Sequence, residues 1–284
     1  LCHSVQHTSR QIAEWTGTPY EKLRFLAAGV NHMAFLLKLE ADGQDLYPKL
    51  RACLDRPEIY KKEKVRFEIL RHFGYFPTES SGHNSEYLPY FRKRQDLIDR
   101  FCRNDFPEVD ENGIDWNSMS AGVSGASVQI CRGLQIRNEK QIAGYLDGSR
   151  EIDLASSVEY GVQIIAAIEK NRPLAANLNV MNRGLIATLP PECCVEVPCL
   201  VDGGGIVPGR IEDFPEQLAA IDRGMVGAQI LGAQGALDGD RRAIFHAIAA
   251  DPNTQSKLGL DEIRSMTDEL FDALADVIDP RFSR

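Results

Sequence analysis

Long apolar runs are missing from this sequence. The longest ones, Met33–Leu37 and Gly161–Ile168, fall far short of the ~20 residues that a helix needs to cross a bilayer. No basic segment followed by an apolar stretch has the pattern of a secretory signal peptide. We therefore expect a protein that does not associate with membranes and that works in the cytoplasm.

Cysteines at regular, paired spacings are also missing. The sequence contains seven cysteines, at positions 2, 53, 102, 131, 193, 194 and 199. Their irregular positions without CxxC spacing argue against a disulfide framework and against a zinc ribbon. The adjacent Cys193 and Cys194 are expected to pack on a strand, where neighbouring side chains point to opposite faces.

The sequence also lacks an excess of positive charge. The net charge is -9, and the densest basic run, Phe91–Arg94, is too short to outweigh it. Proteins that bind nucleic acid usually present a basic face to the phosphates. Nucleic acid is therefore not an expected partner.

The 284 residues are 43% hydrophobic, which suffices for a large core in one or two domains. Helical periodicity and stop signals predict helices at 4–16, after Pro48, and at 58–73, 156–170, 215–235, 239–250 and 261–278. Strands are predicted at 23–27, 33–40, 178–189 and 194–201. The predicted fold class is α+β, mostly helical with a small mixed or antiparallel sheet.

Two segments are predicted to be irregular. Residues 74–90 are polar and rich in turn formers, yet carry aromatic side chains, which is typical of a binding loop held by a scaffold. Residues 104–125 are expected to form a long exposed connection.

A glycine-rich stretch, Gly203–Gly209, follows a predicted strand and raises the question of a dinucleotide site. The dinucleotide fingerprint needs glycine or alanine where Pro208 stands, and a helix should open at once. The next predicted helix begins only near residue 215. We therefore interpret the stretch as a loop and find no nucleotide-binding motif in the sequence.

Cys2 and His32 form the first candidate site. Cys2 lies at the first turn of the predicted helix 4–16, where free amides and the helix dipole favour a thiolate. A thiolate and an imidazole suit Mn, Fe, Co or Zn and leave coordination positions open for substrate. Asn31 could contact a sugar hydroxyl beside such a metal. The residues alone leave open a buried cysteine and a structural histidine.

Tyr87 and Tyr90 form the second candidate, beside His83 and Glu86. A tyrosine acts as a general base only when a nearby cation or metal lowers its pKa from about 10. The alternative is aromatic packing on a loop.

Four separated stretches carry a family resemblance. LCHSVQ, AGVNHMAF, GYFPTESSGHNSEYLPYF and MNRGLIATLPPECCVEVPCLVDGGG occur in this order between residue 1 and about residue 245. Together they resemble the C-terminal portion of glycoside hydrolase family 4, and in particular its α-galactosidase branch. Members of this family are similar to lactate and malate dehydrogenases in architecture.

The resemblance implies that α-galactosides are hydrolysed by a redox route and not by a pair of catalytic carboxylates. NAD oxidises the sugar at C3, and a divalent metal, usually Mn2+, polarises the new carbonyl. A base then removes the C2 proton, the leaving group is eliminated, water adds, and the hydride returns to C3.

The resemblance also implies roles for individual residues. Cys2 and His32 match the metal ligands of the family, and Tyr87 matches the base, with Tyr90 as its competitor. We expect Cys2 and His32 to approach within roughly 4–5 Å, given typical metal–ligand bonds. Tyr87 is expected on a loop that faces the same cavity, with Tyr90 directed elsewhere.

Two further positions follow from the resemblance. His3 stands where α-glucosidase members carry an aspartate taken to be the acid, so it is the candidate proton donor, although this departure leaves the donor open. Asn31 matches the asparagine before the metal histidine and is expected to bind the sugar.

The resemblance implies a domain organisation as well. Residues 1–284 would form the C-terminal metal- and substrate-binding domain, with Leu1 at the junction to an N-terminal NAD-binding domain that this sequence does not include. A homo-oligomer is expected. The alternatives are an α-glucosidase or α-galacturonidase of the same family, and a non-catalytic oligomerisation domain.

Overall fold

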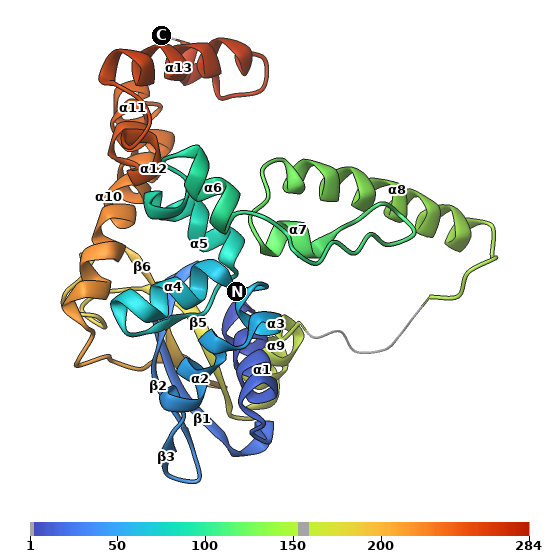
Figure 1. Ribbon diagram of the computed structural model, residues 1–284. Coiled ribbons are helices and arrows are strands. Elements are labelled where there is room, and N and C mark those ends of the chain that lie inside the picture. The colour runs from blue at the N-terminus through green and yellow to red at the C-terminus, as the bar shows by residue number, and fades with distance from the viewer. Residues whose placement is uncertain (1–2, 153–158, 284) are drawn as a thin grey trace.

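The computed structural model describes residues 3–152 and 159–283. Within them, one sheet of seven strands has the order β3-β2-β1-β6-β5, with β4 added beside β2 and β7 beside β6, and every neighbouring pair is antiparallel (Figure 1). The strands are β1 (Leu23–Val30), β2 (Met33–Ala41), β3 (Gln44–Asp45), β4 (Phe76–Pro77), β5 (Leu174–Met181), β6 (Cys194–Asp202) and β7 (Gly205–Pro208).

Helices make up most of the remaining described structure. They are α1 (Ser4–Thr16), α2 (Tyr47–Ala52), α3 (Pro57–Tyr60), α4 (Lys64–Phe73), α5 (Ser81–Tyr87), α6 (Gln95–Phe101), α7 (Trp116–Ser120), α8 (Ala126–Leu146), α9 (Gly161–Lys170), α10 (Glu216–Asp238), α11 (Arg241–Ala250), α12 (Pro252–Gln255) and α13 (Leu260–Ala273). Short 3-10 turns lie at Tyr20–Lys22, Cys53–Asp55, Pro89–Phe91 and Pro280–Ser283. The expected α+β class is confirmed.

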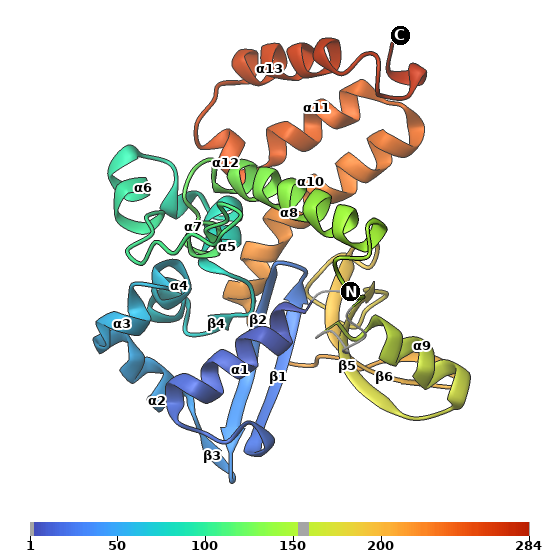
Figure 2. The same cartoon turned by 90° about the vertical axis from the view of Figure 1, so that its right-hand side faces the viewer.

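The sheet separates two hydrophobic clusters because successive strand residues point to opposite faces. On β1, Ala27 packs in a cluster with Ile12 of α1. The next residue, Ala28, packs in the other cluster with Leu218 of α10. Figure 2 shows α1 lying over β1 and β2. The β1–β2 hairpin is therefore held from both sides.

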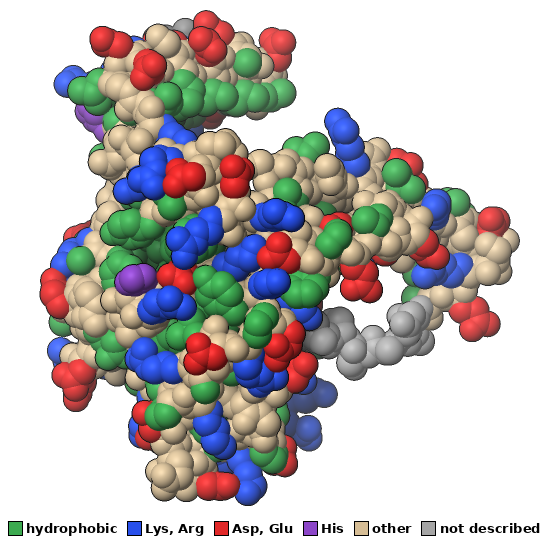
Figure 3. Space-filling model, in the orientation of Figure 1, with side chains coloured by type: hydrophobic (Ala, Val, Ile, Leu, Met, Phe, Trp, Pro, Cys, Tyr) green, Lys and Arg blue, Asp and Glu red, His purple; other side chains and the backbone are tan. Residues whose placement is uncertain are grey.

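Two helical parts extend from this body. α7 and α8 project to one side, and α10 leads to α11 and α13 at the end of the molecule that carries the C-terminus (Figures 1 and 2). Acidic and basic side chains are interspersed on the face drawn in Figure 3. None of the helices in the described ranges is both long enough and apolar enough to span a bilayer.

Several predicted elements are confirmed. α1 covers Ser4–Thr16 and ends at Gly17 in the left-handed conformation. The predicted strands 23–27 and 33–40 are β1 and β2, which are slightly longer. Cys193 is buried and Cys194 is exposed, but only Cys194 lies on a strand, because β6 begins there.

Other predictions need correction. The single helix predicted at 58–73 is α3 and α4, because Glu63 leaves helical geometry at φ -131 and ψ 42. The predicted loop at 74–90 contains β4 and α5, since the Ser80 side chain accepts the amide of His83 and caps a helix. The connection 104–125 contains α7. The stretch Gly203–Gly209 is mostly the β7 hairpin.

The second half of the chain differs as well. The predicted strand 178–189 is β5, which stops at Met181. The side chain of Asn182 then donates to the carbonyls of Ile186, Leu189 and Pro190 at 2.9–3.0 Å and fixes a turn. The helix expected at 156–170 is described from Gly161, with 153–158 outside the described residues. The long helix α8 was not predicted.

Arg66 on α4 ties the N-terminal helix to the sheet. Its side chain is 1% exposed and forms an ion pair at 3.2 Å with Glu63, which is also buried. Its guanidinium donates to Gln11 and Thr8 of α1 and to the carbonyl of Pro77 on β4. It also lies 4.4 Å over the ring of Phe76.

Replacing Arg66 by Met should destabilise the protein by roughly 3–5 kcal/mol, because Glu63 would stay buried without its cation. Urea unfolding followed by circular dichroism measures the change. Arg94→Met, which breaks the exposed Arg94–Asp96 pair, is the matched control and should leave stability unchanged. Equal effects of both substitutions would show that burial of the Arg66 pair does not matter.

Candidate metal centre

His32 lies in the tight turn between β1 and β2. Val30 pairs with Met33, so Asn31 and His32 alone form the turn, and His32 adopts a left-handed φ of 70°. The buried Asn84 of α5 donates its side-chain amide to the carbonyl of His32 at 3.0 Å. A left-handed backbone is uncommon for a residue other than glycine. The hydrogen bond from Asn84 holds His32 in it, so the imidazole keeps one position.

The preceding glycine makes this turn possible. Gly29 has a φ of 147°, and a Cβ there would lie 2.6 Å from the carbonyl oxygen of Met33. Only glycine fits so close to the returning strand.

Glu79 comes from the segment that follows β4. The amide and hydroxyl of Thr78 both donate to the carbonyl of Ala34 on β2, at 2.9 and 3.2 Å. The amide of Ser80 donates to Glu79 Oε1 at 2.8 Å. Ser80 then caps α5, so that His83 lies in the first turn of that helix.

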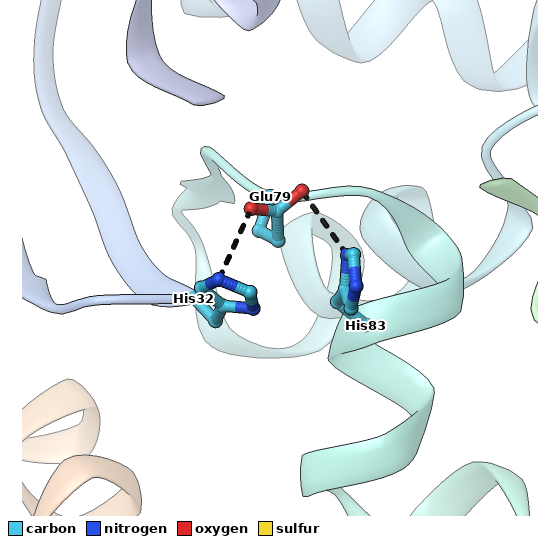
Figure 4. Close-up of side chains that lie close together, drawn as sticks. All are labelled: His32, Glu79 and His83. Atoms are coloured by element: carbon cyan, nitrogen blue, oxygen red, sulfur yellow. Dashed lines mark ion pairs between the residues drawn. The ribbon is translucent and has the colours of Figure 1, made fainter. Parts of the chain in front are cut away.

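These elements bring three metal-binding side chains together (Figure 4). Potential ligand atoms of His32, Glu79 and His83 all lie within 4.8 Å of one another, and all three residues are half-buried. His32 Nε2 lies 3.9 Å from Glu79 Oε2, and His83 Nδ1 lies 3.4 Å from Glu79 Oε1. The carboxylate thus lies between two imidazoles that come from different elements.

The electrostatics favour an ionised Glu79. Burial alone would raise the pKa of Glu79. The hydrogen bond with His83, the amide of Ser80 and the charges of both imidazoles outweigh it and lower the pKa to about 2. The hydrogen bond to Glu79 raises the pKa of His83, whereas burial lowers the pKa of His32. At neutral pH the cluster therefore offers the carboxylate of Glu79 and the neutral imidazole of His32.

These residues fit a divalent metal ion. Buried polar atoms in proteins normally have partners. Among the described residues, however, His32 Nδ1 and Asn31 Oδ1 are buried without a hydrogen-bond partner. Two imidazoles and a carboxylate are a donor set that suits Mn, Fe or Zn.

The centre opens into a cleft of about 530 Å³ between α1, the Asn31–His32 turn and α7. His3, Asn31 and His32, all predicted from the sequence, line it together with Glu79 and His83. His3 directly precedes α1 and pairs with Glu159 at 3.4 Å. Cys2 lies outside the described residues, so its approach to His32 stays a prediction.

Tyr87 and Tyr90 are separated by the fold. Tyr87 is the last residue of α5, whereas a loop was expected, and it does not line the cleft that it was expected to face. Its ring packs edge-on against His32 with 6.0 Å between ring centroids. Burial raises the pKa of Tyr87, and the charges of Glu86 and Glu79 add to this shift. Tyr90 is 50% exposed and packs beside Phe73 instead. Any phenolate at Tyr87 would therefore need a nearby cation.

Sequence reasoning missed Glu79 and His83 as candidate ligands. Their spacing of four residues was the available signal, although Glu79 precedes the Ser80 cap of α5 and only His83 lies on the helix. It went unused because the segment was interpreted as a loop.

Glu196 was missed as well. It lies on β6, where it pairs with Gly29 of β1 and Asn179 of β5. Its side chain is 0% exposed, and neither carboxyl oxygen has a partner among the described residues. Burial raises the pKa of Glu196 to about 8, and the charge of Glu79 adds to the shift. The strand therefore carries a buried carboxyl that is neutral at pH 7.

The chain matches the family 4 glycosyl hydrolases. Residues 27–254 match the model of the family 4 glycosyl hydrolase C-terminal domain, so the chain belongs to this family and the expected membership is confirmed. An alpha-galactosidase of Bacillus subtilis (strain 168) is 35% identical over 97% of this chain. An alpha-galactosidase of Rhizobium meliloti (strain 1021) is 32% identical over 97% of it.

A solved structure shares the fold. It is a 6-phospho-alpha-glucosidase from gut microorganisms in complex with NAD and Mn2+, with a TM-score of 0.67 and 14% identity. The match covers 96% of this chain and 60% of that one. The chain also spans only 60% and 54% of the lengths of the two alpha-galactosidases.

Replacing His83 by Gln should weaken Mn2+ binding by roughly 10- to 100-fold, because it removes a ligand or the group that orients Glu79. Isothermal titration calorimetry with MnCl2 measures this. His72→Gln is the matched control, since His72 on α4 pairs with Glu68 four residues earlier, as His83 does with Glu79. Unchanged Mn2+ affinity in both His83→Gln and His32→Gln would contradict the metal assignment.

Replacing Glu196 by Gln should stabilise the protein at alkaline pH. The folded state raises the pKa above the ordinary value of 4.5, so wild-type stability is full below pH 4.5 and falls as the pH rises through about 8. The variant cannot ionise at this position. It should therefore be roughly 3–5 kcal/mol more stable than the wild type at pH 9 and about as stable as the wild type at pH 4.5. Urea unfolding at both values, with the exposed Glu192→Gln as control, tests it. A pH-independent difference would refute the buried neutral carboxyl.

Proposed function

We propose that the whole protein hydrolyses α-galactosides and that this chain supplies its metal- and sugar-binding half. One observation carries the proposal. His32, Glu79 and His83 converge in an open cleft, and the ring of Tyr87 packs against His32 without lining this cleft. The family members that are 35% and 32% identical to this chain are alpha-galactosidases, which supports the substrate class. A scaffold without catalysis would not need half-buried ligands that face a cleft.

The proposed metal ligands are His32 and Glu79, with His83 as a third ligand or as the group that orients Glu79. Cys2 is a further proposed ligand from the sequence. A divalent ion, Mn2+ in our proposal, would supply Lewis acidity toward a sugar carbonyl. The turn that holds His32 and the capped start of α5 keep these side chains in place without the ion.

Tyr87 is the proposed base that removes the C2 proton in a redox-assisted elimination and addition. Its ring packs edge-on against His32, which brings this side chain beside the candidate centre. A positive charge there would oppose the effect of burial on the pKa of the phenol. The phenol of Tyr87 would then lose its own proton first, and the resulting phenolate would remove the C2 proton of the sugar.

His3 and Asn31 are proposed to contact the sugar from the cleft wall. The unpartnered Oδ1 of Asn31 can accept a hydrogen bond from a sugar hydroxyl. His3 lies at the rim of the cleft and can donate a proton to the leaving oxygen.

NAD is the proposed redox cofactor, but the described residues do not fit a dinucleotide. Gly203–Gly209 contains the β7 hairpin and does not open a helix at whose start a pyrophosphate could bind. We therefore propose that NAD binds to a domain of the whole protein that this chain does not include, and we assign no step of the reaction to it.

Tyr87→Phe should lower turnover of p-nitrophenyl α-galactoside by ~10²- to 10⁴-fold, the usual effect of losing a general base. The assay uses a chain extended to the length of its relatives, with Mn2+, NAD and a reductant. Tyr90→Phe is the matched control and should keep wild-type turnover. Unchanged turnover in Tyr87→Phe would refute the proposed base.

The same assay decides the substrate. Faster hydrolysis of the corresponding α-glucoside or α-galacturonide would replace the proposed sugar, and no hydrolysis of any of the three would favour the non-catalytic domain.

A further inference from the structure

The helix that carries both His83 and Tyr87 is short. α5 has 7 residues, and a helix of that length is not stable by itself in water. Its start is capped by Ser80. The last carbonyl groups of an α-helix have no amide partner within the helix. A group that binds them at the end of α5 therefore fixes the turn that carries Tyr87.

Asn253 of α12 supplies such a group from a distant part of the chain. Its side-chain amide donates to the carbonyl oxygen of Glu86, the residue before Tyr87, across 167 positions of the sequence. Only the nitrogen of this amide can face a carbonyl, because its oxygen is an acceptor as well. α12 lies against α5 (Figures 1 and 2). The end of α5 is therefore held by the C-terminal helices.

α12 is itself fixed at its start. Asp251, which ends α11, accepts from the amide and the hydroxyl of Thr254 at 2.8 and 2.9 Å and caps α12. Pro252 lies against α10, where a Cβ at Gly224 would be 3.7 Å from its Cγ atom. Asn253 therefore holds its amide on a helical turn that is capped and packed.

α10 connects this helical turn with the hairpin that carries His32. Met225 of α10 is buried in the same hydrophobic cluster as Val30 and Met33, the residues on either side of the turn at His32. The ring of Tyr87 packs against this cluster too. The C-terminal helices thus contact both the hairpin of the candidate metal centre and the helix of the proposed base.

Tyr87 is close enough to α12 to be affected by its charge. Burial is the main cause of the raised pKa of Tyr87, and Asp251 adds to the shift after Glu86 and Glu79. A general base must lie within hydrogen-bond reach of the proton that it removes. A displacement of about 1 Å, even one caused far from the reacting atoms, can lower the rate by ~10²-fold.

We propose that Asn253 is a positioning residue for Tyr87. By binding the carbonyl of Glu86, it holds the last turn of α5, and with it the phenol, where the C2 proton can be removed. The inference rests on the proposed function and adds to it a residue of a helix that does not line the cleft of the candidate metal centre.

The test is a double-mutant cycle in a chain extended to the length of its relatives, assayed with Mn2+, NAD and a reductant. Asn253→Leu keeps the size of the side chain and removes the amide. It should lower kcat for p-nitrophenyl α-galactoside by ~10-fold or more and leave KM within about twofold, because the base is displaced while the sugar still binds. Added to Tyr87→Phe, the same substitution should change kcat by less than about twofold, since it acts through the phenol.

An isotope effect gives a second measurement that a loss of stability would not change. The substrate with deuterium at C2 is compared with the ordinary one. The ratio of their kcat values should be larger in Asn253→Leu than in the wild type, because removal of the C2 proton becomes slower relative to the other steps. Circular dichroism shows whether the variant folds. Asn253→Ala, which adds no large apolar group, takes its place if it does not.

Gln217→Leu is the matched control. Gln217 on α10 donates its side-chain amide to the carbonyl of Phe73, the last residue of α4, at 3.4 Å. It thus makes the same kind of contact at the end of a helix that carries no proposed metal ligand and no proposed base. This variant should keep the wild-type kcat and the wild-type isotope effect.

The outcomes separate the positioning role from the proposed function. If Asn253→Leu and Asn253→Ala keep the wild-type kcat, lower it equally with and without the hydroxyl of Tyr87, or leave the isotope effect unchanged, the positioning role is refuted and the proposed function stands. If Tyr87→Phe alone keeps wild-type turnover, or if the extended chain hydrolyses no α-galactoside, the proposed function fails and the inference with it.

Discussion

The carbonyl oxygens of Pro77 and Thr78 are held from several sides, and the position of Glu79 depends on them. Arg66 donates two hydrogen bonds to the carbonyl of Pro77, and Thr8 of α1 donates to the carbonyl of Thr78. Arg66 also donates to Thr8, so helix, strand and loop share one buried network. Because a buried cation without such partners is very costly, the protein keeps this arrangement intact. The next residue in the chain is Glu79, which carries the carboxylate of the candidate metal centre.

The centre gains its electrostatic character from this placement. Glu79 lies half-buried between two imidazoles that keep it ionised, while Glu196 behind it is fully buried and neutral. Two carboxyls in one region therefore differ in charge at neutral pH. A divalent cation would compensate the anion, and the neutral carboxyl avoids a second negative charge in the interior. The unpartnered atoms at His32 and Asn31 fit the same explanation.

The sequence predicted the parts of this arrangement that depend on local patterns. The helix 4–16, the two strands around His32 and the family were correct, because caps, alternation and four separated motifs are local signals. The centre itself needs contacts between Ala34 and Thr78 and between His32 and Asn84, which join distant parts of the chain. The helix α8 was not predicted, because its apolar residues do not gather on one buried face and several of them are exposed.

Anomalous diffraction at the manganese absorption edge, from crystals of this chain grown with MnCl2, tests the central claim most directly. The account predicts one strong peak between His32 and Glu79, at roughly 2.0–2.2 Å from a nitrogen of His32 and an oxygen of Glu79. Density for Cys2 beside that peak would complete the proposed ligand set. A well-ordered structure in which manganese binds elsewhere, or in which Glu79 and His83 pair with each other and no peak lies near His32, would contradict the account.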